Sequence, residues 1–417
     1  MKRFNGIAPA FTRWPLVNDI MRIRALGLGS VGGRFALNAL QRGHTVDAYD
    51  IDPACRGRNL IGAYLSRRDA DRFQFWSTIP VGTFDMTVVC LPTFDPMWGL
   101  CVADLCRALE DLAPTLHRNE LVSIESTVPI GSTEGPIRDV LERSSGFTAG
   151  RDFFLVASPE RIDTNDNWNV RDIVKIIGGV TARCTSVGTE LYETVVDRVN
   201  QVSSARAAET IKLLENAYRF VNISFINEFS ELADAVGVDI HEVVRAAATK
   251  PFGFSAFWPS VAAGGHCVPA ASLSLISTAT DSGVRQNILS ACTVVNEDGA
   301  ERVKRMIGKD VRTVLVLGLA YKSGASSFEN SAGIRLAGDL SAAGYEVTAI
   351  DNTRPEGLPQ SIAFVPISSV SHLRVDVMVI SAWSHLFEEA VMKVRAERIL
   401  RLSGDQRLEY CRPPFAL

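Results

Sequence analysis

The segment that most constrains this chain is a glycine-rich stretch near its beginning. It reads Gly27-x-Gly29-x-x-Gly32, follows a strand-like run at 23–26 and precedes an apolar, helix-like run at 35–40. Glycines in such a turn let the backbone approach a pyrophosphate, and the following helix directs its first N–H groups toward the phosphate charge. The stretch therefore predicts a β–α–β unit that binds a dinucleotide. The backbone groups expected to hold it belong to Gly27, Gly29, Ser30, Val31 and Gly32.

An acidic residue completes this unit, because the second strand-like run ends at Asp50. A carboxylate in that place hydrogen-bonds the free 2′-hydroxyl of a ribose, and it repels the 2′-phosphate of NADP. We therefore expect NAD as the cofactor. The alternative is a glycine turn with a purely structural role in a parallel sheet, which needs no acid at this position.

Strand-like and helix-like runs alternate through the rest of the first half of the chain. Strand-like runs lie at 86–91, 121–124 and 153–156, and helix-like stretches such as 96–109 separate them. This alternation is typical of an α/β protein with a parallel, doubly wound sheet. Ligands of such sheets bind beyond the carboxyl ends of the strands, so the loops that follow these runs are candidate ligand loops.

A long helix is predicted from Ala207 onward. Lys212 and Asn216 lie four residues apart in it and share one helix face. An apolar stripe near the 3.6-residue period predicts which side of the helix faces the core. The members of this stripe are Ile211, Leu214, Ala217, Phe220 and Val221.

A glycine-bearing segment follows this helical region and ends at Cys267, just after the pair Gly264-Gly265. A thiol that faces a lysine and an amide is suited to covalent redox chemistry at a carbonyl. The thiolate attacks, while the cation and the amide stabilise the developing oxyanion. We therefore expect Cys267 to act as a nucleophile with Lys212 and Asn216 as its partners. The alternative is a buried thiol with a structural role.

A second α/β unit is expected from about Lys309 onward. A strand-like run at 312–317 leads into Gly318, a helix-like run covers 332–343, and another strand-like run ends at Asp351. Only Gly318 remains of a glycine fingerprint, so this unit is not expected to bind a full dinucleotide.

Composition excludes several classes of protein. The formal net charge of −4 disfavours a general nucleic-acid binder, and no uncharged apolar run approaches the roughly 18–20 residues of a membrane span. None of the eight cysteines belongs to a CxxC pair or to a Cys/His cluster with zinc spacing, so no metal site is expected. The thiols are expected to be reduced, as in a cytoplasmic protein.

The chain resembles the nucleotide-sugar 6-dehydrogenases, a family that includes the UDP-glucose, UDP-N-acetylglucosamine and UDP-N-acetylmannosamine dehydrogenases. The resemblance rests on the long helix, on Phe252-Gly253-Phe254 and on the run from Gly264 to Pro269, and it extends from about Met21 almost to the C-terminus. It implies that the C6 alcohol of a nucleotide sugar is oxidised to a carboxylate by two NAD molecules. The intermediates would be a thiohemiacetal and then a thioester on Cys267.

The resemblance also implies a three-domain architecture and a homodimer formed through the central helix. A specialised polysaccharide or natural-product pathway would suit such an enzyme. The expected parts are a tail at 1–20, an NAD-binding Rossmann domain at 21–206, a central helical domain with the catalytic cysteine loop at 207–308, and a Rossmann-like, nucleotide-sugar-binding domain at 309–417.

Family roles carry over to individual positions of this sequence by resemblance. Pro92 and Thr93 would lie against NAD, and Thr127 would contact both the cofactor and the catalytic water. Glu160, in a Ser-Pro-Glu-Arg loop typical of the N-acetylhexosamine branch, would bind substrate and act as a base. The remaining residues expected at the substrate are Arg161, Lys212, Asn216, Phe257, Gly264 and Lys322. Strand-end capping is the alternative for both threonines, and a surface position is the alternative for Glu160 and Lys322.

The sequence departs from the family pattern at several positions. Ala271 stands where the family has an acid thought to help the catalytic water, and Glu329 stands where an arginine normally contacts NAD. Further replacements in the cysteine loop and in the third domain are Ser260, Ala262, Ser326 and Ser327. These changes predict an altered substrate, weaker NAD binding or slower thioester hydrolysis.

Two other functions compete with this hypothesis. A one-step hydroxy-acid dehydrogenase resembling 6-phosphogluconate dehydrogenase shares the first domain and a Lys-x-x-x-Asn helix, but it lacks the cysteine loop and the third domain. A catalytically weakened, nucleotide-binding relative is suggested by Ala271 and Glu329, and it is opposed by the retention of Cys267, Lys212 and Asn216.

Overall fold

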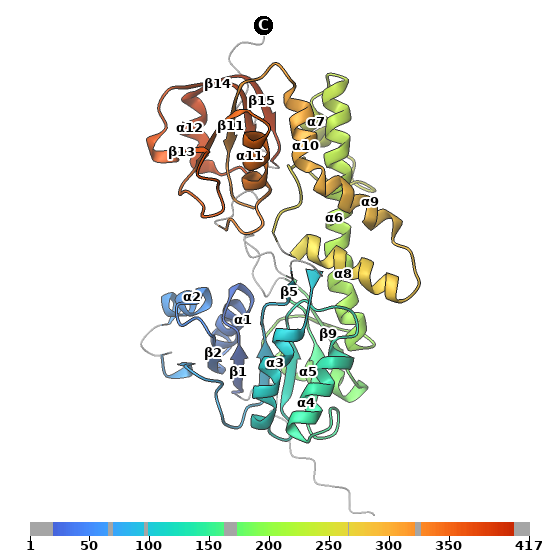
Figure 1. The fold of residues 1–417 in the computed structure, drawn as a ribbon. Coiled ribbons are helices and arrows are strands. Elements are labelled where there is room, and N and C mark those ends of the chain that lie inside the picture. The colour runs from blue at the N-terminus through green and yellow to red at the C-terminus, as the bar shows by residue number, and fades with distance from the viewer. Residues whose placement is uncertain are drawn as a thin grey trace, which may run out of the picture. The chain divides into compact units, whose positions relative to one another are not determined.

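The structure is a computed structural model, and it divides the chain into two compact units (Figure 1). We call them the N-terminal unit, Met1–Thr93 with Cys101–Lys212, and the C-terminal unit, Phe94–Leu100 with Leu213–Leu417. The three-domain boundaries predicted from the sequence stay a prediction. The residues that the structure describes are 20–65, 70–95, 99–161, 173–265, 267–321 and 327–403.

The N-terminal unit is built on an eight-stranded sheet with the strand order β10-β9-β8-β7-β4-β1-β2-β3. Neighbouring strands are parallel, as predicted, except for β8 and β9, which pair antiparallel. The strands are β1 (Arg22–Leu26), β2 (Thr45–Tyr49), β3 (Phe73–Trp76), β4 (Met86–Val89), β7 (Leu121–Ile124), β8 (Phe154–Ala157), β9 (Lys175–Gly179) and β10 (Val199–Gln201).

Helices cover both faces of this sheet. One apolar cluster joins α1 and α5 to the strands, and another joins α3 and α4 to them. Burial on both faces explains why β4, β7 and β8 are buried at every position and carry no alternation of apolar and charged residues. The helical segments are α1 (Ser30–Gln41), α2 (Arg56–Tyr64), η1 (Ala70–Arg72), α3 (Ala103–Leu112), η2 (Ala113–Thr115), the π-helical η3 (Thr133–Ile137), α4 (Arg138–Ser145) and α5 (Ala182–Glu193).

The helix expected at 96–109 begins later than predicted. Gly99 and Leu100 form strand β6, which pairs with β5 (Phe94–Asp95), and helix α3 starts only at Ala103. Gly99 has a φ of +82°, and a Cβ there would lie 2.7 Å from the carbonyl oxygen of Ala270. A close contact with a distant helix, which the local pattern cannot reveal, therefore decides the conformation of this segment.

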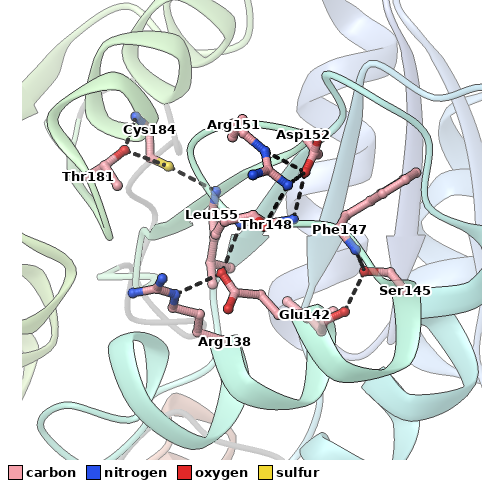
Figure 2. Close-up of polar contacts among 12 residues, drawn as sticks. Arg138, Glu142, Ser145, Phe147, Thr148, Arg151, Asp152, Leu155, Thr181 and Cys184 are labelled. Atoms are coloured by element: carbon pink, nitrogen blue, oxygen red, sulfur yellow. Dashed lines mark hydrogen bonds and ion pairs between the residues drawn. The ribbon is translucent and has the colours of Figure 1, made fainter.

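A polar network fixes the turn that leads into β8 (Figure 2). Asp152, with a side chain only 4% exposed, accepts a hydrogen bond from the backbone N–H of Thr148 (3.0 Å) and one from the guanidinium of Arg151 (2.8 Å). Arg118 donates to its other oxygen. Further along, the backbone N–H of Leu155 donates to the thiol of Cys184, which is therefore a structural cysteine. These contacts hold β8, from whose end the Ser158–Glu160 loop departs.

Helix α6 (Ala205–Ala235) is the long helix predicted from the sequence, and it runs for 31 residues. The predicted core stripe is right for Ala217 and Phe220, which are 6% and 2% exposed. It is wrong for Leu214, which is 64% exposed, whereas its neighbour Leu213 is fully buried. Within the described parts of the chain, no helix is both long enough and apolar enough to cross a membrane.

The C-terminal unit combines a helical part with a second sheet. Its five strands are all parallel, in the order β13-β12-β11-β14-β15. The helices α10 and α11 pack on one face, and α12 packs on the other. The elements are α7 (Ile240–Ala248), α8 (Cys267–Asp281), α9 (Asn287–Glu297), α10 (Gly299–Ile307), β11 (Thr313–Leu317), α11 (Ala332–Ala342), β12 (Glu346–Asp351), β13 (Ala363–Pro366), η5 (Ile367–Ser369), β14 (Leu373–Ile380), η6 (His385–Phe387), α12 (Glu388–Met392) and β15 (Val394–Arg401). The fold is thus an N-terminal Rossmann domain, a helical part and a C-terminal α/β sheet, as predicted.

The second β–α–β unit copies the first more closely than the sequence suggests. The backbone N–H of Leu319 donates to Asp351 over 2.6 Å, just as that of Leu28 donates to Asp50 over 2.6 Å. Gly333 also takes the place of the third fingerprint glycine, because a Cβ there would lie 3.1 Å from the carbonyl oxygen of Gly318. The expectation that Gly318 alone remains of the fingerprint is therefore wrong, since the loop between the two glycines is longer here and hides the spacing.

Candidate active site

The glycine turn of the N-terminal unit has the close approaches that the fingerprint predicts. Gly27 has a φ of +85°, and a Cβ there would lie 2.3 Å from the carbonyl oxygen of Cys90. A Cβ on Gly32 would lie 1.9 Å from the carbonyl oxygen of Gly27. Gly29, the N-cap of α1, faces open space instead, with no described atom within 4 Å of an added Cβ. The turn therefore leaves room beside the first N–H groups of α1, including those of Ser30 and Val31, as a pyrophosphate requires.

Asp50 is held beside this turn by two backbone hydrogen bonds. Its Oδ2 accepts from the N–H of Leu28 over 2.6 Å, and its Oδ1 accepts from the N–H of Asp52 over 2.9 Å. Each carboxylate oxygen can accept a second hydrogen bond. The carboxylate is thus oriented and still able to bind a ribose hydroxyl, so the turn and its acid fit NAD.

Helix α2 supports the turn through a contact that was not predicted from the sequence. The N–H of Gly57 donates to the carbonyl oxygen of Leu28 over 2.7 Å, and a Cβ on Gly33 would lie 2.3 Å from the Cα of Gly57. Helices α1 and α2, which carry Gly33 and Gly57, are therefore in direct backbone contact. A glycine at position 57 on a helix with no obvious apolar stripe was the signal for this contact.

Two loops at the carboxyl ends of β4 and β7 are joined to each other. The hydroxyl of the buried Thr93 donates to the carbonyl oxygen of Thr127 over 2.6 Å. The hydroxyl of Ser126 donates to the carbonyl oxygen of Leu91 over 2.7 Å. Pro92 between them is exposed, and Thr127 is half-buried. Both predicted threonines therefore lie at the ligand edge of the sheet, where the hydroxyl of Thr93 links the two loops.

Glu160 follows β8 at the same edge, and it is not a surface residue. Its side chain is 10% exposed, and its Oε2 lies 3.1 Å from the ammonium of Lys175. The backbone N–H of Arg161 donates to its Oε1 over 2.7 Å, while the guanidinium of Arg161 donates to the carbonyl oxygen of Val174 over 2.9 Å. The surface alternative for Glu160 is therefore wrong.

Glu125 extends this ion pair into the interior, and it was not among the residues predicted for the site. Lys175 also donates to Glu125, whose other oxygen accepts from the hydroxyl of Tyr192. Burial raises the pKa of Glu125 to about 7, although the charge of Lys175 opposes this shift. Burial alone would lower the pKa of Lys175, but the two carboxylates raise it. The position of Glu125, directly after a wholly buried strand, was the available signal.

The helix pair and the thiol are placed by α6 and α8. Lys212 and Asn216 lie four residues apart on α6, and Asn216 is 4% exposed. Within the C-terminal unit, its amide lies 3.4 Å from the carbonyl oxygen of Cys267. Cys267 is the first residue of α8. Among the described cysteines it is the exposed one, so the alternative of a buried structural thiol is wrong.

The chain just before Cys267 is fixed by a second loop of the C-terminal unit. Asn330 donates from its side chain to the carbonyl oxygen of Gly265 over 2.7 Å, and the N–H of Gly265 donates back to the carbonyl oxygen of Asn330 over 3.2 Å. A Cβ on Gly264 would lie 2.7 Å from the carbonyl oxygen of Tyr321. Asn330 is thus a contact of the cysteine loop that was not predicted from the sequence.

The positions that depart from the family pattern have clear local environments. The N–H of Ser260 donates to the side-chain oxygen of Asn227 over 2.7 Å, and Ala262 is buried. Ala271 is fully buried on α8, one turn after Cys267. Glu329 is exposed and its N–H donates to the hydroxyl of Ser327.

One predicted substrate residue, Phe257, is half-buried and packs edge-on against the ring of Tyr218, with 6.0 Å between the ring centroids. Lys322 and Ser326 lie outside the described residues, as does His266. Their predicted environments stay predictions.

Two segments of the chain match domains of one enzyme family. Residues 57–196 match the NAD-binding domain of the UDP-glucose/GDP-mannose dehydrogenase family, and residues 206–298 match its central domain. Together they cover more than half of the chain.

Individual proteins of the same kind are similar over most of their length. A UDP-N-acetyl-D-mannosamine dehydrogenase of Pyrococcus horikoshii is 30% identical over 344 residues, which is 76% of this chain and 79% of that protein. A UDP-N-acetyl-D-glucosamine 6-dehydrogenase of Pseudomonas aeruginosa is 27% identical over 91% of this chain and 96% of that protein. The solved structure of a UDP-glucose dehydrogenase from Pyrobaculum islandicum superposes with a TM-score of 0.79 over 95% of this chain and 100% of that chain, at 23% identity, and so shares its fold.

Proposed function

The chain belongs to the UDP-glucose/GDP-mannose dehydrogenase family, and from that premise we propose how its residues oxidise the C6 hydroxyl of a nucleotide sugar to a carboxylate. The observation that carries the proposal is Cys267, an exposed thiol at the first turn of α8 whose backbone lies against Asn216. A structural cysteine would be buried, and a one-step dehydrogenase would need no nucleophile here.

The cofactor is NAD, held by the turn at Gly27–Gly32 and by Asp50 as its geometry suggests, with Pro92, Thr93 and Thr127 at the nicotinamide end. NAD supplies the acceptor for one hydride in each of two oxidations. Asp50 would favour NAD over NADP because its fixed carboxylate has room for a hydroxyl and repels a phosphate.

In the proposed sequence, the C6 alcohol first loses a proton and a hydride and becomes an aldehyde. The thiolate of Cys267 then adds to the aldehyde carbon, and the new alkoxide is stabilised by Lys212 and Asn216. A preorganised donor of this kind is typically worth roughly 3–4 kcal/mol in the transition state. Loss of a second hydride from this carbon converts the thiohemiacetal into a thioester. Water then adds to the thioester and releases the acid and the thiol.

Glu160 is the proposed base for the water, and Thr127 helps to orient it. Arg161, Phe257, Gly264 and Lys322 complete the proposed substrate site. The Ser158–Glu160 loop and the names of the similar Pyrococcus and Pseudomonas proteins support a UDP-N-acetylhexosamine as substrate, with a UDP-hexose as the second choice.

A homodimer formed through α6 is proposed from the exposed apolar side chains along that helix. Their spacing of three, four and seven residues gathers them into one stripe. Its members are Leu214, Tyr218, Phe225, Phe229, Leu232 and, just past the end of the helix, Val236, each 39% exposed or more. Sequestering such a stripe against a second copy removes it from water. A cytoplasmic location fits the free thiols of the described cysteines, and it is likewise a proposal.

The stoichiometry of NAD reduction tests the activity. We expect about two NADH per molecule of UDP-N-acetylhexosamine consumed, followed by absorbance across a panel of nucleotide sugars. Cys267→Ser should abolish acid formation and leave NAD binding unchanged, because the hydroxyl of serine is a far poorer nucleophile and leaving group at neutral pH. One NADH per substrate would instead indicate a one-step dehydrogenase, and no reduction with any nucleotide sugar would indicate a weakened relative.

A further inference from the structure

The proposed base Glu160 is the outermost member of a buried group of ionisable side chains in the N-terminal unit. We call this group the Glu125 cluster, and it consists of Glu125, Glu160, Lys175 and Tyr192. Its members come from four different elements: Glu125 follows β7, Glu160 follows β8, Lys175 begins β9 and Tyr192 lies near the end of α5.

Contacts connect the cluster from the interior to the ligand edge. The hydroxyl of Tyr192 lies 2.7 Å from that of Ser123 and donates to Glu125. Lys175 donates to Glu125 and, over 3.1 Å, to Glu160. The side chains of Glu125, Lys175 and Glu160 are 0%, 6% and 10% exposed. Of the two carboxylates, Glu160 at the edge of the sheet is therefore the one that retains contact with solvent.

Within the cluster, two carboxylates contact one ammonium, that of Lys175. Burial disfavours the ionised form of a carboxyl, and Glu125 is the more deeply buried of the two. Among the residues that the structure describes, the titratable groups that face Glu125 are Lys175, Glu160, Tyr192 and Cys90, and Lys175 is the cation of this set. Burial accordingly raises the pKa of Glu125 to about 7, so this carboxyl exchanges its proton near neutral pH.

We propose that Glu125 is a positioning residue that controls, through Lys175, how strongly the carboxylate of Glu160 is held and how readily it accepts a proton. When Glu125 is protonated, the charge of Lys175 acts on Glu160 alone and weakens it as a base. When Glu125 is ionised, Lys175 is shared between the two carboxylates and Glu160 is the stronger base. The inference rests on the proposed function, in which Glu160 accepts a proton from the hydrolytic water.

A purely structural cluster would behave differently. Its loss would lower the stability of the fold and reduce activity at every pH alike. A cluster that sets the basicity of Glu160 changes the pH at which activity rises, because full activity then requires ionised Glu125. The pH dependence of kcat therefore separates the two roles, since hydrolysis follows both hydride transfers and the acidic limb of kcat reports the ionisations of the substrate-bound enzyme.

The variant Glu125→Gln tests the inference with the full-length protein, NAD and a UDP-N-acetylhexosamine. Glutamine keeps the hydrogen bond to Tyr192 and fixes the uncharged state, so Glu160 always receives the full charge of Lys175. The acidic limb then reports the ionisation of Glu160 alone. We expect this limb to move to lower pH by about one unit, because a neighbouring charge shifts the pKa of a carboxyl on that scale. We also expect the plateau to fall roughly tenfold, because the base is weaker.

A matched control and a second variant accompany this test. Glu120→Gln removes another fully buried carboxylate of the same sheet, which pairs with Arg24 over 2.6 Å, and it should leave the limb in place. Tyr192→Phe keeps every charge but removes a donor to ionised Glu125. Ionisation of Glu125, and with it the rise to full activity, should therefore move to higher pH. This variant decides the matter if Glu125→Gln fails to fold.

Infrared spectroscopy gives a readout that does not depend on turnover. A protonated-carboxyl band should titrate near pH 7 in the parent, disappear in Glu125→Gln and persist in Glu120→Gln. The carboxylate band that is lost in Glu160→Gln should shift over the same pH range.

Several outcomes are decisive. Limbs that move in opposite directions in Glu125→Gln and Tyr192→Phe support the inference. An unmoved limb in an active Glu125→Gln enzyme, or a Glu160 band that does not shift as Glu125 titrates, overturns it. If the parent reduced NAD with no nucleotide sugar, the proposed function would fail on its own, and the infrared shift would still decide whether the two carboxyls are coupled.

Discussion

At the scale of single residues, the candidate site has a thiol at Cys267 and no acidic side chain at Ala271. They lie one turn apart on α8, so an acidic side chain at position 271 would stand on the same face of the helix as the thiol. In this chain that position is a fully buried methyl group. In the proposed mechanism, hydrolysis of the thioester then depends on Glu160 and on the Glu125 cluster.

We predict that the thioester accumulates during turnover, with a burst of NADH and a mass adduct on Cys267. Ala271→Asp should speed the steady state, by up to roughly 10²-fold, because a positioned base typically contributes about 10²–10⁴-fold. The buried carboxylate should also lower the melting temperature.

Ser272→Asp is the matched control, since it adds an acid at a neighbouring buried position that points about 100° further round the helix, away from Cys267. It should lower stability without any gain in rate. The absence of an adduct at steady state would contradict the prediction, as would an Ala271→Asp variant no faster than the parent.

At the scale of elements, strand β8 is fixed by polar contacts in the turn before it, and the Ser158–Glu160 loop follows its other end. Its entry turn is closed by Asp152, and its exit carries Ser158 and Glu160. The hydrogen bond from Arg151, followed by that from the backbone of Thr148, lowers the pKa of Asp152 to about 2.

This depressed pKa predicts a stability that depends on pH. An aspartate with a lowered pKa stabilises the fold above its unfolded pKa of about 4, and this contribution is lost as the pH falls toward 2. Asp152→Asn should therefore lower the melting temperature at pH 7, and the difference from the parent should shrink between about pH 4 and pH 2.

Thermal unfolding followed by circular dichroism across this range measures the difference. Asp111→Asn, a change of another acid in the same unit, provides the comparison. A constant gap between Asp152→Asn and its parent at every pH would mean that the network acts through shape rather than charge.

At the scale of the whole molecule, α6 is the element that continues from the N-terminal unit into the C-terminal unit. Its buried side carries Ala217 and Phe220, while its other side presents the exposed apolar stripe that includes Phe225 and Leu232. The same 31-residue helix also carries Lys212 and Asn216. Dimerisation through the stripe would therefore stabilise the helix on which the site is built.

The stripe predicts the oligomeric state. Phe225→Glu combined with Leu232→Glu should convert a dimer into a monomer, because two charges would be desolvated in the interface. Light scattering coupled to size-exclusion chromatography measures the mass. Met392→Glu, at an apolar position that is 81% exposed on α12, should leave the dimer intact. A parent that is itself monomeric would refute the proposed assembly.

The sequence by itself determined the features that depend on local spacing. The turn at Gly27–Gly32 with Asp50, the long helix with Lys212 and Asn216, and the position of Cys267 were all predicted from residue patterns. Glycine fingerprints and helical periods are short-range properties, so they can be read along the chain. The start of α3 at Ala103, by contrast, was missed because the conformation of Gly99 depends on Ala270, far away in the sequence.

Only the tertiary structure decided which side chains became partners. Nothing in the spacing of Glu125, Lys175 and Tyr192 indicates that they meet, because they lie on separate elements that the sheet order and the antiparallel pairing of β8 with β9 bring together. The same holds for Asn330 and Gly265, and for the exposure of Leu214 beside the buried Leu213. Burial and charge pairing are properties of three-dimensional packing, and a local pattern gives only the face that a side chain prefers, not the neighbour that it finds.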